Sequence, residues 1–138
     1  VVIHRNPGLG VTFLCIRGGR SILGNCFRAS FRIEGTVWPS VQHYFHHFKA
    51  LMFGDRAIAR AIRATFSGAT AKRLGRRVKG FDPIKWDRVS TRVMTRAVFY
   101  KFTCNRTCRE SLLSTKDSII IECGVNNREW SNGLEAGD

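Results

Sequence analysis

The sequence lacks any hydrophobic run that approaches the roughly 20 apolar residues needed to cross a bilayer. Residues 1–7 contain no apolar core of signal-peptide length, and the chain does not begin with Met. We therefore expect no association with membranes and a cytoplasmic location, for a chain that is either a fragment or a processed product.

Acidic residues are scarce, because 10 Asp and Glu stand against 23 Lys and Arg, which gives a formal net charge of +13. The surplus is concentrated from Arg56 to Arg109, where 15 basic residues accompany only Asp82 and Asp87. Such a surplus attracts polyanions or phosphorylated small molecules, although scattered charges more commonly form a solvated surface that only aids solubility. No recognised nucleic-acid motif is present, so we expect any nucleic-acid binding to be weak and non-specific.

Cysteines occur in an odd number, five, without a secretory context, and we interpret them as reduced thiols. Cys104 and Cys108 have a spacing that could supply half of a metal site, but no second pair completes it. His43, His46 and His47 also have a spacing that could suit a metal on one helix. We favour surface histidines, or histidines that support a site without binding the ligand. The sequence therefore predicts no metal and no cofactor.

A helix predicted over residues 41–52 has signals at both ends. Ser40 can accept a hydrogen bond from a free N–H of the first turn, and Gly54 tolerates the left-handed conformation in which helices end. Helical spacing predicts one apolar face, which comprises Val41, Tyr44, Phe45, Phe48, Leu51 and Met52. A second, polar side carries Gln42, His43, His46 and Lys49.

The rest of the pattern predicts a single α+β domain, because strands come first, helices follow and one strand closes the chain. The predicted strands are 11–16, 30–34 with a hairpin return at 36–37, and 118–123, the last one central in its sheet. The further predicted helices are 56–64, 69–74, a longest one that starts at Asp82-Pro83, and 107–113. The expected buried faces are Ala57, Ile58, Ala61 and Ile62 on the first of these, and Ile84, Val89, Val93, Ala97 and Phe102 on the longest.

The segment from Ser40 to Phe45, S-V-Q-H-Y-F, resembles the S-V-E-H-Y-F signature of the NADAR superfamily, the YbiA-like N-glycosidases. Other segments resemble the family's motifs in the same order along the chain. They are Gly24-Asn25 with Phe27, Phe31 to Gly35, Trp38 to Ser40, Ala71 to Arg76, Trp86 with Val93-Met94, Lys101-Phe102 with Asn105, Leu112 to Thr115, Glu122, and Asn127 to Gly133.

The resemblance implies a compact α+β domain, with a small β-sheet packed with several helices, that cleaves N-glycosidic bonds of phosphorylated ribosides. Its NADAR-like part is 24–138, and 1–23 is an N-terminal strand segment of the same domain that the family does not match. A C-terminal helix usual in the family is missing. Bacterial relatives act on an aminouracil intermediate of riboflavin synthesis and other members remove ADP-ribose from modified bases. The implied partner is therefore a phosphorylated riboside or an ADP-ribose-type molecule.

Cleavage of a ribosyl C–N bond builds positive charge on the sugar, which one carboxylate can stabilise while a second activates water. The resemblance places catalytic positions at Gln42, Asn127 and Glu122. Gln42 stands where the family has Glu, and Asn127 stands where it has Asp. An amide keeps the shape and a hydrogen bond but cannot act as a general base. Two interpretations therefore stay open, an N-glycosidase and a binding module that has lost catalysis.

Phosphate requires cationic donors, and a flat base requires an aromatic face for stacking. The substrate-binding residues that the resemblance implies are Asn25, Trp38, His43, Lys49, Arg73, Trp86, Asn105 and Trp130. Lys72 and Arg76 are further cationic candidates, and Lys49 is the favoured one. For Trp38 and Trp86, a place in the hydrophobic core is an equal alternative.

Overall fold

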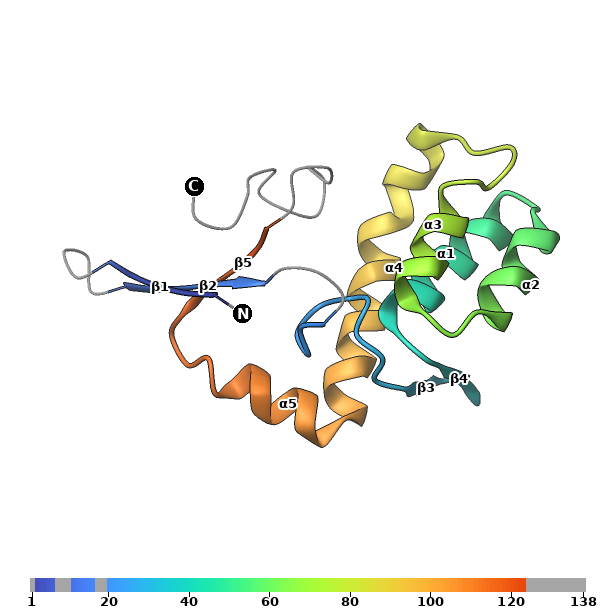
Figure 1. Cartoon of the computed structure of the whole chain (residues 1–138). Helices are drawn as coiled ribbons and strands as arrows, with labels where there is room; N and C mark the ends of the chain where they lie inside the picture. The colour runs from blue at the N-terminus through green and yellow to red at the C-terminus, as the bar shows by residue number, and fades with distance from the viewer. Residues whose placement is uncertain (1, 7–10, 17–19, 124–138) are drawn as a thin grey trace.

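The computed structural model describes residues 2–6, 11–16 and 20–123 (Figure 1). Its five helices are α1 (Val41–Met52), α2 (Arg56–Ala64), α3 (Gly68–Gly75), α4 (Pro83–Cys104) and α5 (Arg106–Leu113). The helix starts follow from their caps: the side chains of Ser40, Asp55 and Asp82 each accept a hydrogen bond from a first-turn N–H. Gly54 has a φ of 75° directly after α1. All five predicted helices are confirmed.

The strands form two separate sheets. β3 (Phe31–Ile33) and β4 (Thr36–Trp38) make the predicted hairpin, which turns at Glu34 and Gly35, both with positive φ. β1 (Val2–Asn6), β2 (Val11–Ile16) and β5 (Ile119–Glu122) form a mixed sheet in the order β1-β2-β5. The α+β class is confirmed. The central position predicted for β5 is wrong, because β5 pairs only with β2 among the described strands and leaves Ile119 47% exposed.

α1 is the central helix, since it packs against α2, α3 and α4. In Figure 1 the three-stranded sheet lies on the opposite side of α4 from α1, α2 and α3, and α5 leads from α4 to β5. Glu122, the last residue of β5, interacts electrostatically with Lys101 of α4 and with Cys26 of the loop that precedes β3.

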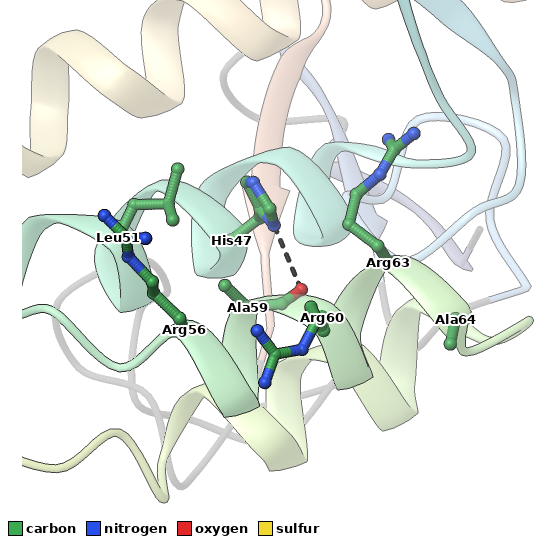
Figure 2. A pocket seen from close by; sticks show the side chains of 7 residues that line it. All are labelled: His47, Leu51, Arg56, Ala59, Arg60, Arg63 and Ala64. Atoms are coloured by element: carbon green, nitrogen blue, oxygen red, sulfur yellow. Dashed lines mark hydrogen bonds between the residues drawn. The ribbon is translucent and has the colours of Figure 1, made fainter.

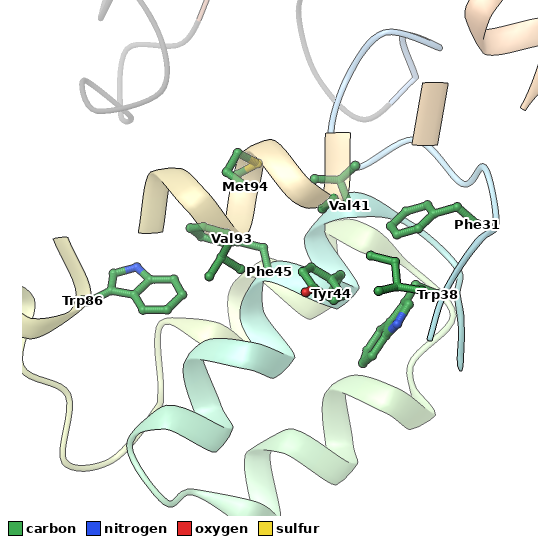
Figure 3. Packing of buried hydrophobic residues seen from close by; sticks show 10 residues of the cluster. Phe31, Trp38, Val41, Tyr44, Phe45, Trp86, Val93 and Met94 are labelled. Atoms are coloured by element: carbon green, nitrogen blue, oxygen red, sulfur yellow. The ribbon is translucent and has the colours of Figure 1, made fainter. Parts of the chain in front are cut away.

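The main hydrophobic cluster fills the space between α1, α4 and the hairpin (Figure 3). It contains Phe31, Ile33, Trp38, Val41, Tyr44, Phe45, Trp86, Val93, Met94 and Ala97. A second cluster joins α1 to α2 and α3 and contains Ala50, Ala59, Ile62, Ala71 and Val78. Each large side chain buried in this way stabilises the fold by about 1.5–3 kcal/mol.

The predicted faces of α1 need correction. Phe48, Leu51 and Met52 are 42%, 50% and 40% exposed, whereas the polar residues Gln42 and His46 are buried. His43 is also fully buried, so the interpretation of these histidines as surface residues is wrong for His43 and His46. The physical reason is that α1 has helical neighbours on several sides, and a helix surrounded in this way buries more than one stripe.

The outer helices differ from prediction at single positions. On α2 the buried residues are Ala59 and Ile62, and Ala57 is exposed. On α4 Val93 and Ala97 are buried as predicted, but Ile84 is 69% exposed. The buried residues of α4 that the prediction did not include are Trp86, Ser90, Met94 and Lys101. The predicted face contains only apolar residues, whereas α4 in fact buries a face that also contains the Lys101 ammonium and the Ser90 hydroxyl.

Gly75, the last residue of α3, lies against the side chain of His46 on α1. A Cβ atom added at Gly75 would come within 2.8 Å of His46 Cβ and closer still to the imidazole ring. We expect Gly75→Ala to lower the free energy of unfolding by about 1–3 kcal/mol, as overpacking of a filled site does. Denaturant melts of the purified variant at neutral pH measure this loss.

The matched control for Gly75→Ala is the same change in a His46→Ala background. Without the ring there is space for the new methyl group, so the alanine should be neutral or stabilising there, since alanine favours helix over glycine by about 0.8–1 kcal/mol. An equal loss in both backgrounds would show that the His46 contact is not the cause.

Candidate active site

Lys101 is the most unusual residue of the described core, because its side chain is fully buried on α4. Its Nζ donates a hydrogen bond to the carbonyl oxygen of Gly24 at 2.8 Å. Burial lowers the pKa of the Lys101 ammonium to about 8. A buried ammonium is costly unless anionic or polar groups face it. The groups around Lys101 are therefore expected to form a polar site.

The loop from Gly24 to Cys26 connects this lysine to α1 and α3. The carbonyl oxygen of Asn25 accepts a hydrogen bond from the backbone N–H of Gln42 at 3.1 Å. The Asn25 amide nitrogen lies 3.7 Å from Met94 Sδ on α4. Gly68 allows the start of α3 to approach the loop, because a Cβ there would lie 2.6 Å from the Cys26 carbonyl oxygen. The loop from Gly24 to Cys26 thus contacts α1, α3 and α4.

Four ionisable groups form what we call the Glu122 cluster: Cys26, Lys72, Lys101 and Glu122. Burial raises the pKa of the Glu122 carboxyl, while the ammonium groups of Lys72 and Lys101 lower it. Burial also raises the pKa of the Cys26 thiol, and both lysines oppose that shift. Glu122, at the end of β5, is thus a half-buried carboxyl whose charged form is favoured only by the two lysines. A carboxyl whose pKa is raised by burial and that faces cations is a candidate for proton transfer.

Gln42 and His46 lie one turn apart on the same side of α1, and each side chain is 7% exposed. Gln42 Oε1 and His46 Nδ1 are buried without a hydrogen-bond partner among the described residues. Burial, together with smaller effects of the cations of Lys49, Lys72 and Arg76, lowers the pKa of His46 to about 3. The backbone N–H of Gln42 bonds to the carbonyl oxygen of Asn25, the neighbour of Cys26, so this part of α1 adjoins the Glu122 cluster. Lys72 acts electrostatically on both His46 and Glu122.

Several predicted substrate-binding residues instead stabilise the fold. Trp38 packs edge-on against Tyr44, with 5.2 Å between the ring centroids, and Trp86 packs against Phe45 with 5.1 Å between the centroids. Both tryptophans therefore lie in the hydrophobic core. The ring nitrogens of His43 lie 2.8 Å from Ser40 Oγ and 3.0 Å from the Thr65 carbonyl oxygen. These contacts leave the buried His43 ring no free nitrogen for a ligand.

Asn105 is occupied as well, because its amide nitrogen donates to the carbonyl oxygens of Ser30 and Lys101.

Lys49 Nζ lies 3.9 Å from the centroid of the Phe81 ring. Phe81 and Trp86 line a pocket of about 390 Å³, so the ring that Lys49 contacts belongs to this pocket. Arg73 is exposed and donates to Thr70 Oγ1 at 3.4 Å. Asn127 and Trp130 lie outside the described residues.

Of the residues predicted for the site, Asn25 and Gln42 share a backbone hydrogen bond, and Glu122 interacts electrostatically with Cys26, the neighbour of Asn25. The structure adds Lys72, which was only a cationic candidate, and Lys101 and Cys26, which the sequence did not assign to the site. The signal for Lys101 was a lysine on the apolar side of the longest predicted helix, a position where a charge requires an explanation.

Cys26, Cys104 and Cys108 are free thiols. Within the described ranges, no three His, Cys, Asp or Glu side chains lie close enough together to hold a metal ion. The same part of the chain contains no helix with the length and apolar character of a membrane span.

The chain is similar to proteins of one family in sequence and in fold. The family described as NADAR domain matches residues 19–138. An N-glycosidase of Acanthamoeba polyphaga mimivirus is 33% identical over 103 residues, which cover 75% of this chain and 61% of that protein. The riboflavin biosynthesis protein PYRR of Zea mays is 32% identical over 106 residues, or 72% of this chain and 17% of that protein.

The NMR structure of the E. coli protein YbiA has the same fold, with a TM-score of 0.71 at 26% identity. The likeness covers 87% of this chain and 73% of that one. The chain spans less than two thirds of the length of the curated relatives named above.

Proposed function

Because the chain belongs to the NADAR domain family, we propose that it carries an N-glycosidase site for the C–N bond of a phosphorylated riboside. The observation that carries the proposal is the Glu122 cluster, in which a half-buried carboxyl interacts electrostatically with two lysines, beside a loop that hydrogen-bonds to the backbone of Gln42. The names of the relatives support this reaction class, since one is an N-glycosidase and another a riboflavin biosynthesis protein.

The roles follow from the chemistry of the reaction. Glu122 acts as the carboxyl group, either as a proton donor to the leaving base or as the charge that stabilises the developing cation. Lys72 supplies positive charge for the phosphate or for sugar oxygens, whereas the fully buried Lys101 favours the charged form of Glu122. Gln42 Oε1, an acceptor without a partner, receives a hydrogen bond from a ribose hydroxyl. In this proposal Asn127 and Trp130 complete the site at the amide position and at the stacking face of the base.

The substrate class is a ribosylamino intermediate of riboflavin synthesis or an ADP-ribosylated base. Incubation of the protein with ribosylamine phosphates and with ADP-ribosylated nucleosides should release free sugar phosphate, which chromatography detects. Glu122→Gln should lose this release, whereas Glu110→Gln should keep it, because Glu110 is exposed on α5 and pairs with Arg106. A folded wild-type protein that releases no sugar above the buffer rate would contradict the proposal.

A binding module without catalysis is the second candidate, and the amides at Gln42 and Asn127 favour it. This function predicts that ADP-ribose or ribose phosphate raises the melting temperature without turnover, because a ligand that binds only the folded state stabilises it. A melting temperature unchanged at millimolar ligand would count against this alternative.

A further inference from the structure

A groove between α1 and α2 is rich in arginine and lies away from the candidate active site. Its volume is about 580 Å³, and its lining comprises His47, Leu51, Arg56, Ala59, Arg60, Arg63 and Ala64 (Figure 2). The lining contains three guanidinium groups and no carboxylate. Within the groove, His47 Nδ1 lies 3.1 Å from the Ala59 carbonyl oxygen, so a hydrogen bond links α1 to α2.

The groove and the Glu122 cluster use different sides of α1. Gln42 and His47 are five residues apart, which corresponds to roughly 140° around a helix. Gln42 and His46 adjoin the Glu122 cluster, whereas His47 and Leu51 line the groove. A ligand of the groove would therefore not occupy the site assigned to the glycosidase reaction.

The three arginines form a track along α2. Their spacing of four and then three residues places them within roughly 60° of one another and along roughly 10 Å of the helix. All three are exposed, and no Asp or Glu among the described residues pairs with them. Arg63 is held in place, because its Nη1 donates to the Val37 carbonyl oxygen and its guanidinium lies 4.4 Å from the Trp38 ring centroid.

An exposed aromatic ring follows α2 in the sequence. Phe66 follows three residues after Arg63, in the connection between α2 and α3, and is 74% exposed. The guanidinium of Arg28 lies 4.0 Å from the Phe66 ring centroid and donates to the Phe66 carbonyl oxygen at 2.8 Å. Arg28 thus fixes an apolar ring in an exposed position and adds a fourth cation beside it.

We propose that Arg56, Arg60, Arg63 and Phe66 form a binding surface for single-stranded nucleic acid. A row of cations follows a phosphate backbone, and an exposed aromatic ring stacks on a base. Bases of a duplex are not free to stack on Phe66, which favours a single strand. An acidic polypeptide would pair with the arginines but offers no flat ring for Phe66.

Fluorescence anisotropy with a fluorescein-labelled dT oligonucleotide tests the proposal. Arg56→Glu with Arg60→Glu should weaken binding at least about tenfold and reduce the salt slope by about 1–1.5, since each lost single-strand phosphate contact removes about 0.7. Arg88→Glu with Arg92→Glu is the matched control, because it makes the same charge change at the same spacing on exposed positions of α4. This control should change affinity less than about threefold.

Phe66→Ala should weaken binding at least about fivefold without changing the salt slope. Equal losses from the two charge-reversal pairs would overturn the proposal in favour of attraction by net charge alone. Displacement of the oligonucleotide by polyglutamate at equal charge would overturn it in favour of an acidic polypeptide. Release of sugar phosphate should be unchanged in Arg56→Glu with Arg60→Glu, so failure of this surface and failure of the glycosidase site are separable.

Discussion

Acidification from pH 6.5 to pH 3 should lower the free energy of unfolding by up to about 5 kcal/mol through His46 alone. In the folded protein the buried ring stays neutral until about pH 3, whereas in the unfolded chain it gains a proton near pH 6.5. Between these values the unfolded state binds more protons, so stability falls as the pH falls. Above pH 6.5 neither state is protonated, and His46 does not make stability depend on pH.

Urea melts of the wild type and of His46→Asn at several pH values between 7 and 3 measure this effect. The difference in unfolding free energy between the two proteins should shrink or reverse as the pH falls, because asparagine does not titrate. The cavity left by asparagine is the same at each pH and therefore cancels. Burial raises the pKa of Glu122, which acts in the opposite sense and stabilises the folded state in acid, but it is present in both proteins.

His47→Asn is the matched control. Its ring is less buried and its Nδ1 is bonded to the Ala59 carbonyl oxygen, a contact that raises the pKa and opposes the effect of burial. It should change the pH dependence less than His46→Asn does. Parallel pH profiles for the wild type and His46→Asn would mean that the His46 ring is not held neutral by burial.

The helices could be predicted because residues at their N-terminal ends are good helix caps. Ser40, Asp55 and Asp82 are good cap residues, and each one caps the helix that it predicted. Burial within the helices was less predictable. Periodicity assigns polar residues to the outside, whereas α1 has neighbours on several sides and buries Gln42, His43 and His46. The edge position of β5 was also out of reach, because an apolar run does not reveal how many strands pair with it.

The candidate site was likewise only partly predictable from the sequence. Asn25, Gln42 and Glu122 were predicted from motif resemblance. A backbone hydrogen bond joins Gln42 to Asn25, and Glu122 acts electrostatically on Cys26 in the same loop. Lys101 was missed because a lysine in a helical pattern counts as a surface residue, and its burial depends on a carbonyl group 77 positions earlier in the chain. Trp38 and Trp86 could serve in a core or in a site, and only packing decides between these roles.

Gln42→Glu should raise the glycosidase activity by roughly 10²–10⁴-fold, the range that one positioned acid or base supplies. The structure places Gln42 on the side of α1 that adjoins the Glu122 cluster, with a buried oxygen that no described residue engages. A carboxylate there would return negative charge beside the ribose, where the transition state develops positive charge. Asn127→Asp should add less than its independent effect, because both groups act on one transition state.

The burial of Gln42 also changes the effect that Gln42→Glu is expected to have on the free energy of unfolding. Helix propensity alone predicts that Gln42→Glu hardly affects stability, since the two residues have similar propensities. A side chain that is 7% exposed must instead hold its charge largely out of water. We therefore expect a loss of about 1–3 kcal/mol at neutral pH, with some compensation if the ammonium of Lys72 reaches the new carboxylate. Binding of a cationic or hydroxyl-bearing ligand should recover part of this loss.

Gln42→Met separates charge from shape, because it keeps the length of the side chain and removes both the acceptor and the charge. Steady-state rates of sugar-phosphate release should rise for Gln42→Glu and fall or stay at background for Gln42→Met. If the wild type turns over well and Gln42→Glu changes nothing, the amide does not lie at the reacting centre. If Gln42→Glu with Asn127→Asp folds, binds ADP-ribose and stays inert, the lost charges are not what prevents catalysis. The cause would then lie in the arrangement of Glu122, Lys72 and Lys101, and the binding function would be the one that this site retains.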